Sequence, residues 1–175
     1  AEFQGKLYAA GRFSMAGDIV ANNIAVWDGI RLSAVGGGVD NMVLSLVVWN
    51  NKLIVGGMFD NAGGLAIHRV AAWDGSSWSA LSLGISGQVW DMTVYNGDLI
   101  VVGNFGSAGG IGANGVARWN GVNWFPLSTG TDALTQSAVV YDGKLIVGGS
   151  FYVAGPTPAN RIAAWDGISW SALGD

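Results

Sequence analysis

Short apolar runs alternate with clusters of glycine, asparagine and aspartate along the whole chain. Leu53-Ile54-Val55 is a typical run, and Asn96-Gly97 and Asp142-Gly143 are typical clusters. Runs of this length that contain β-branched and aromatic residues and are bounded by turn residues predict β-strands. No segment places apolar residues at helical spacing, and glycine is too frequent for stable helices. The pattern therefore predicts an all-β protein.

The apolar pattern repeats every 46 residues, with no insertion or deletion across four copies. Three sets of positions keep this step: Trp27, Trp73, Trp119 and Trp165; Phe13, Phe59, Phe105 and Phe151; and the Ala-Gly pairs at 16–17, 62–63, 108–109 and 154–155. A fixed period of this length is typical of a repeat architecture in which each copy is one supersecondary unit.

Each copy is predicted to hold four strands. In the second copy these are 43–49, 53–59, a third strand that ends at Trp73, and 78–81. The first strand has counterparts at 89–95 and 135–141. Two turns separate the strands, because Asn, Asp and Gly tolerate the positive φ that tight hairpins need. Four antiparallel strands in a repeat of this length form one blade of a β-propeller. The predicted blades are 1–37, 43–83, 89–129 and 135–175, within a single domain over 1–175.

A lone blade cannot bury both of its apolar faces, so blades must stack on one another. This explains why the strands are nearly continuous apolar runs and do not alternate with polar residues. The repeated tryptophans are therefore predicted to fill the space between blades. The alternative is that their aromatic rings stack on sugar rings.

The repeated motifs resemble those of known propellers. The segments "LIVGGSF" (145–151), "NRIAAWDG" (160–167) and "SWSAL" (169–173) resemble a kelch-type blade. They also resemble the W-D-G-x-x-W-x-x-L-G repeats of large bacterial proteins, many of them exported. The resemblance covers the whole chain and implies a propeller that binds partners, with a lean towards a secreted or cell-surface location. Kelch-like propellers also include the platform of galactose oxidase, whose copper site needs a Cys-modified Tyr and His ligands. This chain has no Cys and one His, so that activity is not implied.

Four blades are fewer than the six or seven of most kelch propellers, and three interpretations of the ring stay open. The chain is a piece of a longer propeller, or it pairs with a second copy to form a homodimer with an eight-bladed ring, or it closes alone. Open ends of repeat arrays need capping, and exposed strand edges invite pairing.

Composition excludes several classes of function. The net charge is −4 and no basic cluster exists, so we expect no nucleic-acid partner. No apolar run is long enough for a membrane-spanning helix, and we expect no membrane partner. The absence of Cys removes thiolate chemistry and Cys-based zinc sites. We expect no metal and no cofactor.

Residues that break the repeat are better candidates for function than residues that keep it. Trp90 aligns with Leu44 and Gln136 near one mouth of the expected channel. Asp91 aligns with two serines. Together they form the candidate ligand site, where a carboxylate would bind a sugar hydroxyl or a cation.

A second candidate set is a partner surface. It consists of His68, Arg69, Arg118 and Arg161. His68 stands where the other copies have Asn, and a single His makes a weak metal site. The aspartates at the second turn of three copies are explained by turn chemistry.

The sequence contains no constellation for catalysis. The sequence offers no Ser-His-Asp order around its one His, and the carboxylates lie mostly in turns. We expect a non-enzymatic propeller module that acts as a binding or assembly scaffold for a protein or glycan ligand. Its first candidate surface is formed by the connectors 14–23, 60–69, 106–115 and 152–161, because loops on a rigid scaffold vary most freely. The alternative is a carbohydrate-binding or carbohydrate-active module with its site at Trp90 and Asp91.

Overall fold

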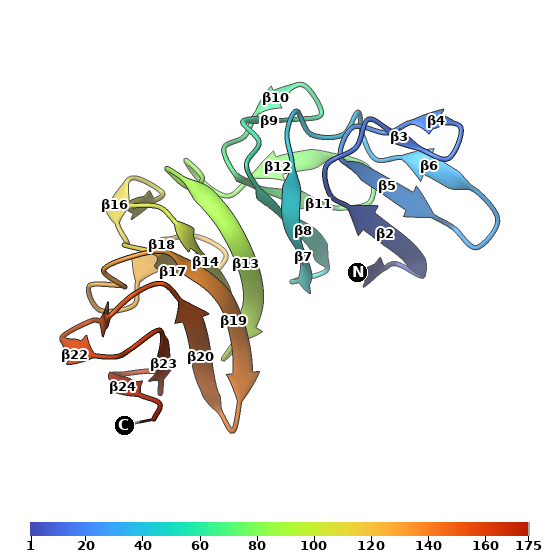
Figure 1. The fold of residues 1–175 in the computed structure, drawn as a ribbon. Coiled ribbons are helices and arrows are strands. Elements are labelled where there is room, and N and C mark those ends of the chain that lie inside the picture. Colours follow the sequence, from blue (N-terminus) through green and yellow to red (C-terminus); the bar gives the residue numbers. More distant parts are fainter. Residues whose placement is uncertain (175) are drawn as a thin grey trace. The chain divides into compact units, whose positions relative to one another are not determined.

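The computed structural model describes residues 1–174, and within them the protein is all-β without helices. The chain divides into two compact units, Ala1–Gly84 and Ile85–Asp175. Each unit holds two four-stranded antiparallel sheets (Figure 1). Within the described residues, no helix has the length and apolar character that crossing a membrane requires.

The four sheets are blades of the β-propeller type, one for each 46-residue repeat. Blade 1 contains β1 (Glu2–Phe3), β2 (Lys6–Ala10), β5 (Ile24–Trp27) and β6 (Leu32–Ala34). Blade 2 contains β7 (Val43–Trp49), β8 (Lys52–Gly57), β11 (Val70–Trp73) and β12 (Trp78–Ala80). Blade 3 contains β13 (Gln88–Tyr95), β14 (Asp98–Asn104), β17 (Val116–Trp119) and β18 (Trp124–Pro126). Blade 4 contains β19 (Thr135–Tyr141), β20 (Lys144–Gly149), β23 (Ile162–Trp165) and β24 (Trp170–Ala172).

The predicted strands are confirmed to within two residues, with one informative difference. The second strand of blade 2 ends at Gly57 and does not reach Phe59. Phe59 is fully buried beyond the end of the strand, in the core of the first unit. The repeated Phe therefore anchors the connector that follows the strand.

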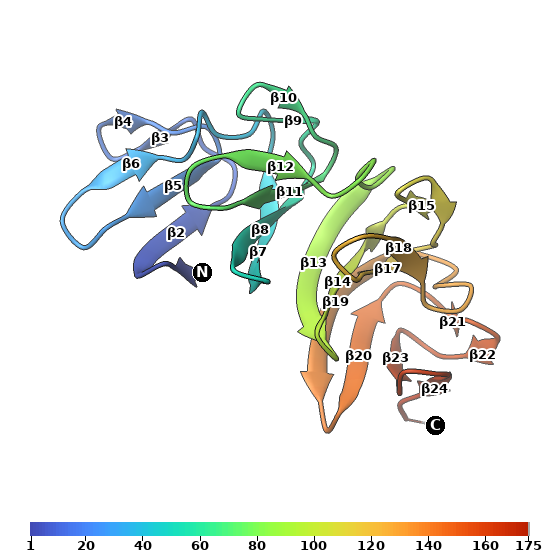
Figure 2. The same cartoon turned by 180° about the vertical axis from the view of Figure 1, so that it is seen from behind.

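The connectors between the second and third strands, which were expected to be loops, contain regular structure. Each contains a small two-stranded hairpin: β3 (Met15–Ala16) with β4 (Ile19–Val20), β9 (Asn61–Ala62) with β10 (Leu65–Ala66), β15 (Ser107–Ala108) with β16 (Ile111–Gly112), and β21 (Val153–Ala154) with β22 (Thr157–Pro158). In the first unit, β9–β10 lies beyond one end of the strands of blade 2 in both views (Figures 1 and 2). We call this end of every blade the connector end.

The two blades of each unit pack face to face. The Trp face of a blade is defined by the positions of Leu53, Val55, Ala71 and Trp73, and the Ile face by those of Ile54, Gly56, Val70 and Ala72. In the first unit, the Trp face of blade 2 shares a core with Tyr8 and Ile24 on the Ile face of blade 1. In the second unit, Leu145 and Val147 of blade 4 share a core with Ile100 on the Ile face of blade 3.

The repeated tryptophans do pack as predicted, with one exception. Trp73 and Trp78 are buried and tilted against each other, with ring centroids 5.0 Å apart. Equivalent pairs occur in blades 3 and 4. Such a pair contributes about 0.5–1.5 kcal/mol beyond the area it buries. In blade 1 the partner is Leu32, and Trp27 is 39% exposed.

In blades 2, 3 and 4, a glycine of the connector hairpin makes room for the tryptophan beneath it. Gly63 has a φ of +58°, and a methyl group there would overlap the Trp78 indole and lie 2.8 Å from the Gly36 carbonyl oxygen. The neighbouring Gly64 also has positive φ, at +81°, but a methyl group there meets no atom within 4 Å. A side chain at Gly64 would therefore introduce backbone strain alone, whereas a side chain at Gly63 would add steric overlap to the same strain.

We therefore expect Gly64→Ala to lower the free energy of unfolding by about 1–2 kcal/mol, the cost of placing an L-residue in the left-handed region. Gly63→Ala should cost about 1–3 kcal/mol more, because overpacking adds to the same strain. Urea unfolding of both variants measures the difference. Equal losses would show that the Trp78 contact does not constrain the hairpin.

The turn between the third and fourth strands is held by a carboxylate. Asp74 Oδ1 accepts hydrogen bonds from the N–H groups of Ser76 and Ser77, at 2.8 Å each, and both serine hydroxyls donate to the same carboxylate. These bonds, led by the Ser77 N–H, lower the pKa of Asp74 far below its ordinary value of 3.8. Asn120 makes the same backbone contacts in blade 3 with a neutral side chain.

Because the pKa of Asp74 is lower in the folded state, its contribution to stability is complete above about pH 4 and is lost as the pH falls below that value. Asp74→Asn removes this titration and keeps the acceptor that Asn120 uses. We expect the thermal midpoint of the variant to fall less than that of the wild type below about pH 4. Parallel midpoint curves in acid would contradict this.

Candidate functional site

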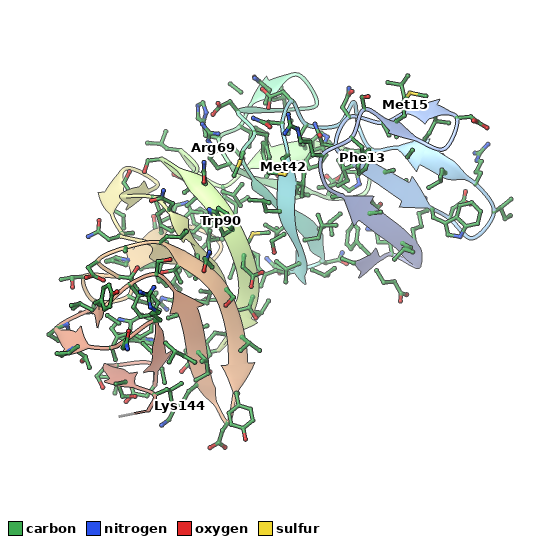
Figure 3. The ribbon with its side chains drawn as sticks, in the orientation of Figure 1. Phe13, Met15, Met42, Arg69, Trp90 and Lys144 are labelled. Atoms are coloured by element: carbon green, nitrogen blue, oxygen red, sulfur yellow. The ribbon has the colours of Figure 1, made fainter. Side chains whose placement is uncertain are left out.

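Trp90 occupies a β-bulge in the first strand of blade 3. The pairing of β13 with β14 shifts register between Val89 and Asp91, so Trp90 is the extra residue without a partner in the ladder. The same shift occurs in β7 and β19. Bulges re-aim side chains, which gives Trp90 an environment different from that of its neighbours. Its indole N–H donates to Gln88 Oε1 at 3.2 Å, and its side chain is half-buried (Figure 3).

Asp91 is committed to the backbone of the second unit. Its Oδ1 accepts from the Met92 N–H at 2.8 Å, and its Oδ2 accepts from the Ala138 N–H of β19 at 3.0 Å. The carboxylate therefore links the first strands of blades 3 and 4. Both oxygens already have donors, which leaves the residue poorly suited to receive a sugar hydroxyl.

His68 and Arg69 converge on one carboxylate at the connector end of blade 2. His68 Nδ1 lies 3.0 Å from Asp60 Oδ1, and Arg69 Nη2 donates to Asp60 Oδ2 at 3.1 Å. Arg69 also donates to the Met58 carbonyl oxygen. The cluster is partly exposed, and an ion pair such as that of Arg69 with Asp60 contributes no more than about 1 kcal/mol.

Arg161 has the equivalent position in blade 4 with a different partner. Its Nη2 donates to the Tyr152 hydroxyl at 2.6 Å, and its guanidinium lies 4.9 Å from the centre of the Tyr152 ring. Tyr152 stands where blade 2 has Asp60. Arg69 and Arg161 both have positive φ, at +66° and +68°. The Asn and Gly at this position in the other two copies are the sequence signal for that conformation.

Arg118 lies away from the connector end. Its Nη1 donates to Asp98 Oδ2 at 2.6 Å, and its guanidinium lies 4.7 Å from the centre of the Phe125 ring. A cavity of about 200 Å³ adjoins the pair and is also lined by Trp165. Lys144, the blade 4 counterpart of Asp98, lies beside the turn between β19 and β20 (Figure 3). The structure thus places Arg118 and Arg161 at opposite ends of the strands in the second unit.

A cavity of about 630 Å³ lies at the connector end between blades 1 and 2 of the first unit. Its lining includes Arg12, Phe13, Asn22, Asp40 and Asn61. An equivalent cavity of about 440 Å³ lies between blades 3 and 4. The two cavities are related by the repeat, because both form where the chain crosses from one blade to the next.

Asp40 is hydrogen-bonded within the wall of the larger cavity. Arg12 is therefore the charged side chain of this lining that has no partner among the described residues. Burial alone would raise the pKa of Asp40, but hydrogen bonds from the Asn61 side chain and from the N–H groups of Asn61 and Asp60 outweigh it and lower the pKa. Arg12 is exposed and makes no hydrogen bond or ion pair with any described residue. In the smaller cavity its place is taken by Asn104.

Among residues 1–174 there is no group of three or more His, Cys, Asp or Glu side chains that could hold a metal ion. The described carboxylates discussed above are bound to turns, arginines or neighbouring strands. The arrangement provides hydrogen-bonding groups for recognition.

Comparison with known proteins supports the fold. Residues 142–163, from the first turn of blade 4 to the start of its third strand, are similar to a family described as a β-propeller domain of unknown function (DUF5122). No curated protein matches the chain significantly.

Sequence reasoning missed several residues that organise these sites. They are Arg12, Asp40, Asp60, Asp98, Phe125 and Tyr152. Comparison of the copies contains the signal for one set, because Asp98 replaces a Lys of the other three copies and Phe125 replaces a Ser. Asp98 and Phe125 both contact Arg118, which also differs from its counterparts in the other copies. The repeat pattern thus marks the residues, while their convergence is visible only in the fold.

The hydrogen bonds of Asp91 allow a structural role of this residue to be tested against a role in ligand binding. Asp91→Ala should lower the free energy of unfolding by about 1.5–3 kcal/mol, because a charged acceptor of the Ala138 N–H is lost. Asp91→Ser, which installs the residue of the equivalent positions, should cost less. Urea unfolding measures both. Unchanged stability in Asp91→Ala would contradict the structural role.

Proposed function

We propose that the chain is a non-enzymatic propeller module that binds a ligand at its connector end. The observation that carries this proposal is the unpaired guanidinium of Arg12 in the cavity of about 630 Å³ in the first unit. Cavities of about 300–1,000 Å³ are typical of small-molecule sites. The ligand is therefore a small group or the tip of a larger molecule.

The distribution of repeated and variable residues supports a scaffold. Repeated positions such as Trp73, Phe59 and Gly63 are used in packing and turns. The connectors vary between copies and lie at the connector end of each blade, where loops can change without loss of the fold. His68, Arg69 and Arg161 belong to this variable set. In its own unit, each of these residues adds to the candidate surface outside the cavity.

The chemistry of the lining favours a hydroxyl-rich ligand such as the terminal sugar of a glycan. Arg12 offers several N–H donors in a fixed plane, which suits adjacent hydroxyl groups. Asn22 and Asn61 add amide oxygens, since their Nδ2 groups already donate to the Gly37 carbonyl oxygen and to Asp40. Phe13 adds a half-buried ring. A glycan ligand fits a secreted or cell-surface location. The alternative site at Trp90 and Asp91 has weaker support, because the Asp91 carboxylate already bonds two backbone N–H groups.

A glycan array probed with the wild type and with Arg12→Asn tests the proposal. Arg12→Asn copies Asn104 of the smaller cavity and should weaken binding about 10–100-fold, because a hydrogen bond to a charged group is worth about 1.5–3 kcal/mol. Asn104→Arg should strengthen binding by providing a second guanidinium in the equivalent place. Trp90→Ala is the control and should bind like the wild type.

The proposal fails if no glycan binds the wild type, or if Arg12→Asn binds as well as the wild type does. Loss of binding in Trp90→Ala alone would instead place the site on β13.

A further inference from the structure

The Trp face of blade 1 is uncovered, although its residues match those that are buried in blades 2 and 4. Leu7 is 54% exposed and Trp27 is 39% exposed. Their equivalents in blade 2, Leu53 and Trp73, are 0% and 6% exposed against blade 1. The Leu and Trp of this face are the same residues in both blades. Their exposure therefore differs because another blade covers this face in blade 2 but not in blade 1.

The Ile face of blade 4 is uncovered in the same way. Ile162 is 39% exposed and Ile146 is half-buried. Their equivalents in blade 3, Val116 and Ile100, are 0% exposed against blade 4. Each chain thus presents one Trp face and one Ile face, the two surfaces that join blades within each unit.

Tyr141 identifies a specific contact that is missing at the Ile face. Its equivalent in blade 3, Tyr95, is 5% exposed and has its hydroxyl 3.3 Å from the Gly143 carbonyl oxygen and 3.5 Å from that of Trp165. Tyr141 is 74% exposed. The positions that correspond to Gly143 and Trp165 on blade 1 are Gly5 and Trp27.

Blade 1 also lacks a donor that serves covalently linked blades. Trp78 Nε1 donates to the Gly36 carbonyl oxygen at 3.0 Å, and Trp170 Nε1 donates to that of Leu127 at 3.1 Å. Both acceptors lie in the chain segment that crosses from the preceding blade. Blade 1 has Leu32 at this position and therefore offers no indole N–H to such a segment.

We propose that the Ile face of blade 4 docks on the Trp face of blade 1 in a second copy of this chain. The joint repeats the interface seen inside both units, and the Tyr141 hydroxyl bonds the Gly5 or Trp27 carbonyl oxygen of the other copy. Each chain supplies one face of each kind, so two joints close a dimer of eight blades. This inference is independent of the ligand cavity, since it uses other faces of the blades.

Light scattering of the intact chain tests the proposal. We expect a mass of about 36 kDa, twice the 18.0 kDa of one chain. Leu7→Asp and Ile162→Asp each place a charge in the joint and should raise the dissociation constant at least about 100-fold, because an unpaired buried charge costs several kcal/mol. Tyr141→Phe removes one hydrogen bond from each of the two joints and should raise it about 5–150-fold.

Val122→Asp is the matched control. Val122 is 72% exposed although blade 4 packs on blade 3, so its position lies outside the blade interface and the variant should stay at about 36 kDa. Far-ultraviolet circular dichroism confirms that the variants are folded, which the exposure of Leu7 and Ile162 in one chain leads us to expect.

Three results would overturn the proposal. They are a wild-type mass of about 18 kDa at every accessible concentration, a mass that grows beyond two chains, and dissociation by only one of the two Asp variants. The last result would mean that like faces meet, because a joint between unlike faces needs both surfaces intact.

Discussion

The packing of one blade's Trp face on the preceding blade's Ile face is the interaction on which the rest of the structure depends. A single blade has two apolar faces and no means of covering them, whereas two blades cover one face each. Leu53 and Trp73 in the first unit and Leu145 in the second are buried by this contact. One face of blade 1 and one face of blade 4 lack this contact, as the exposure of Leu7 and Ile162 shows.

The residues that this packing requires can be distinguished from the candidates for function by whether they keep the 46-residue step. Positions that keep the 46-residue step are occupied by packing and turn residues, as Trp78 and Gly63 show. Residues that break the step are not required for this packing and lie mainly at the ends of the strands. Asp98 and Arg118 replace residues of other chemistry and meet each other at 2.6 Å. Arg12 departs from the step as well and lines the cavity of about 630 Å³ in the first unit, with no hydrogen-bond or ion-pair partner among residues 1–174.

The candidate site shows where reasoning from the copies succeeds and where it stops. Trp90 and Asp91 were recognisable as departures, yet a linear pattern does not show that Asp91 bonds the Ala138 N–H of another blade. The connectors were recognisable as the variable segments, but their hairpins and cavity depend on contacts between segments far apart in the chain. Arg12 and Asp40 are 28 positions apart and line one wall only after the blades have packed.

The sequence by itself determined the all-β class, the four copies, the strand order within each blade and the turn positions. These features depend on local propensity and on a repeat that offers three internal comparisons for every position, so each signal is reinforced. Only the tertiary structure decided which face each residue occupies against a neighbour, which carboxylates are already bonded, and which charges remain unpaired. Those properties depend on distances between segments that the order of residues leaves open, and both the connector-end cavity and the exposed faces of blades 1 and 4 arise from them.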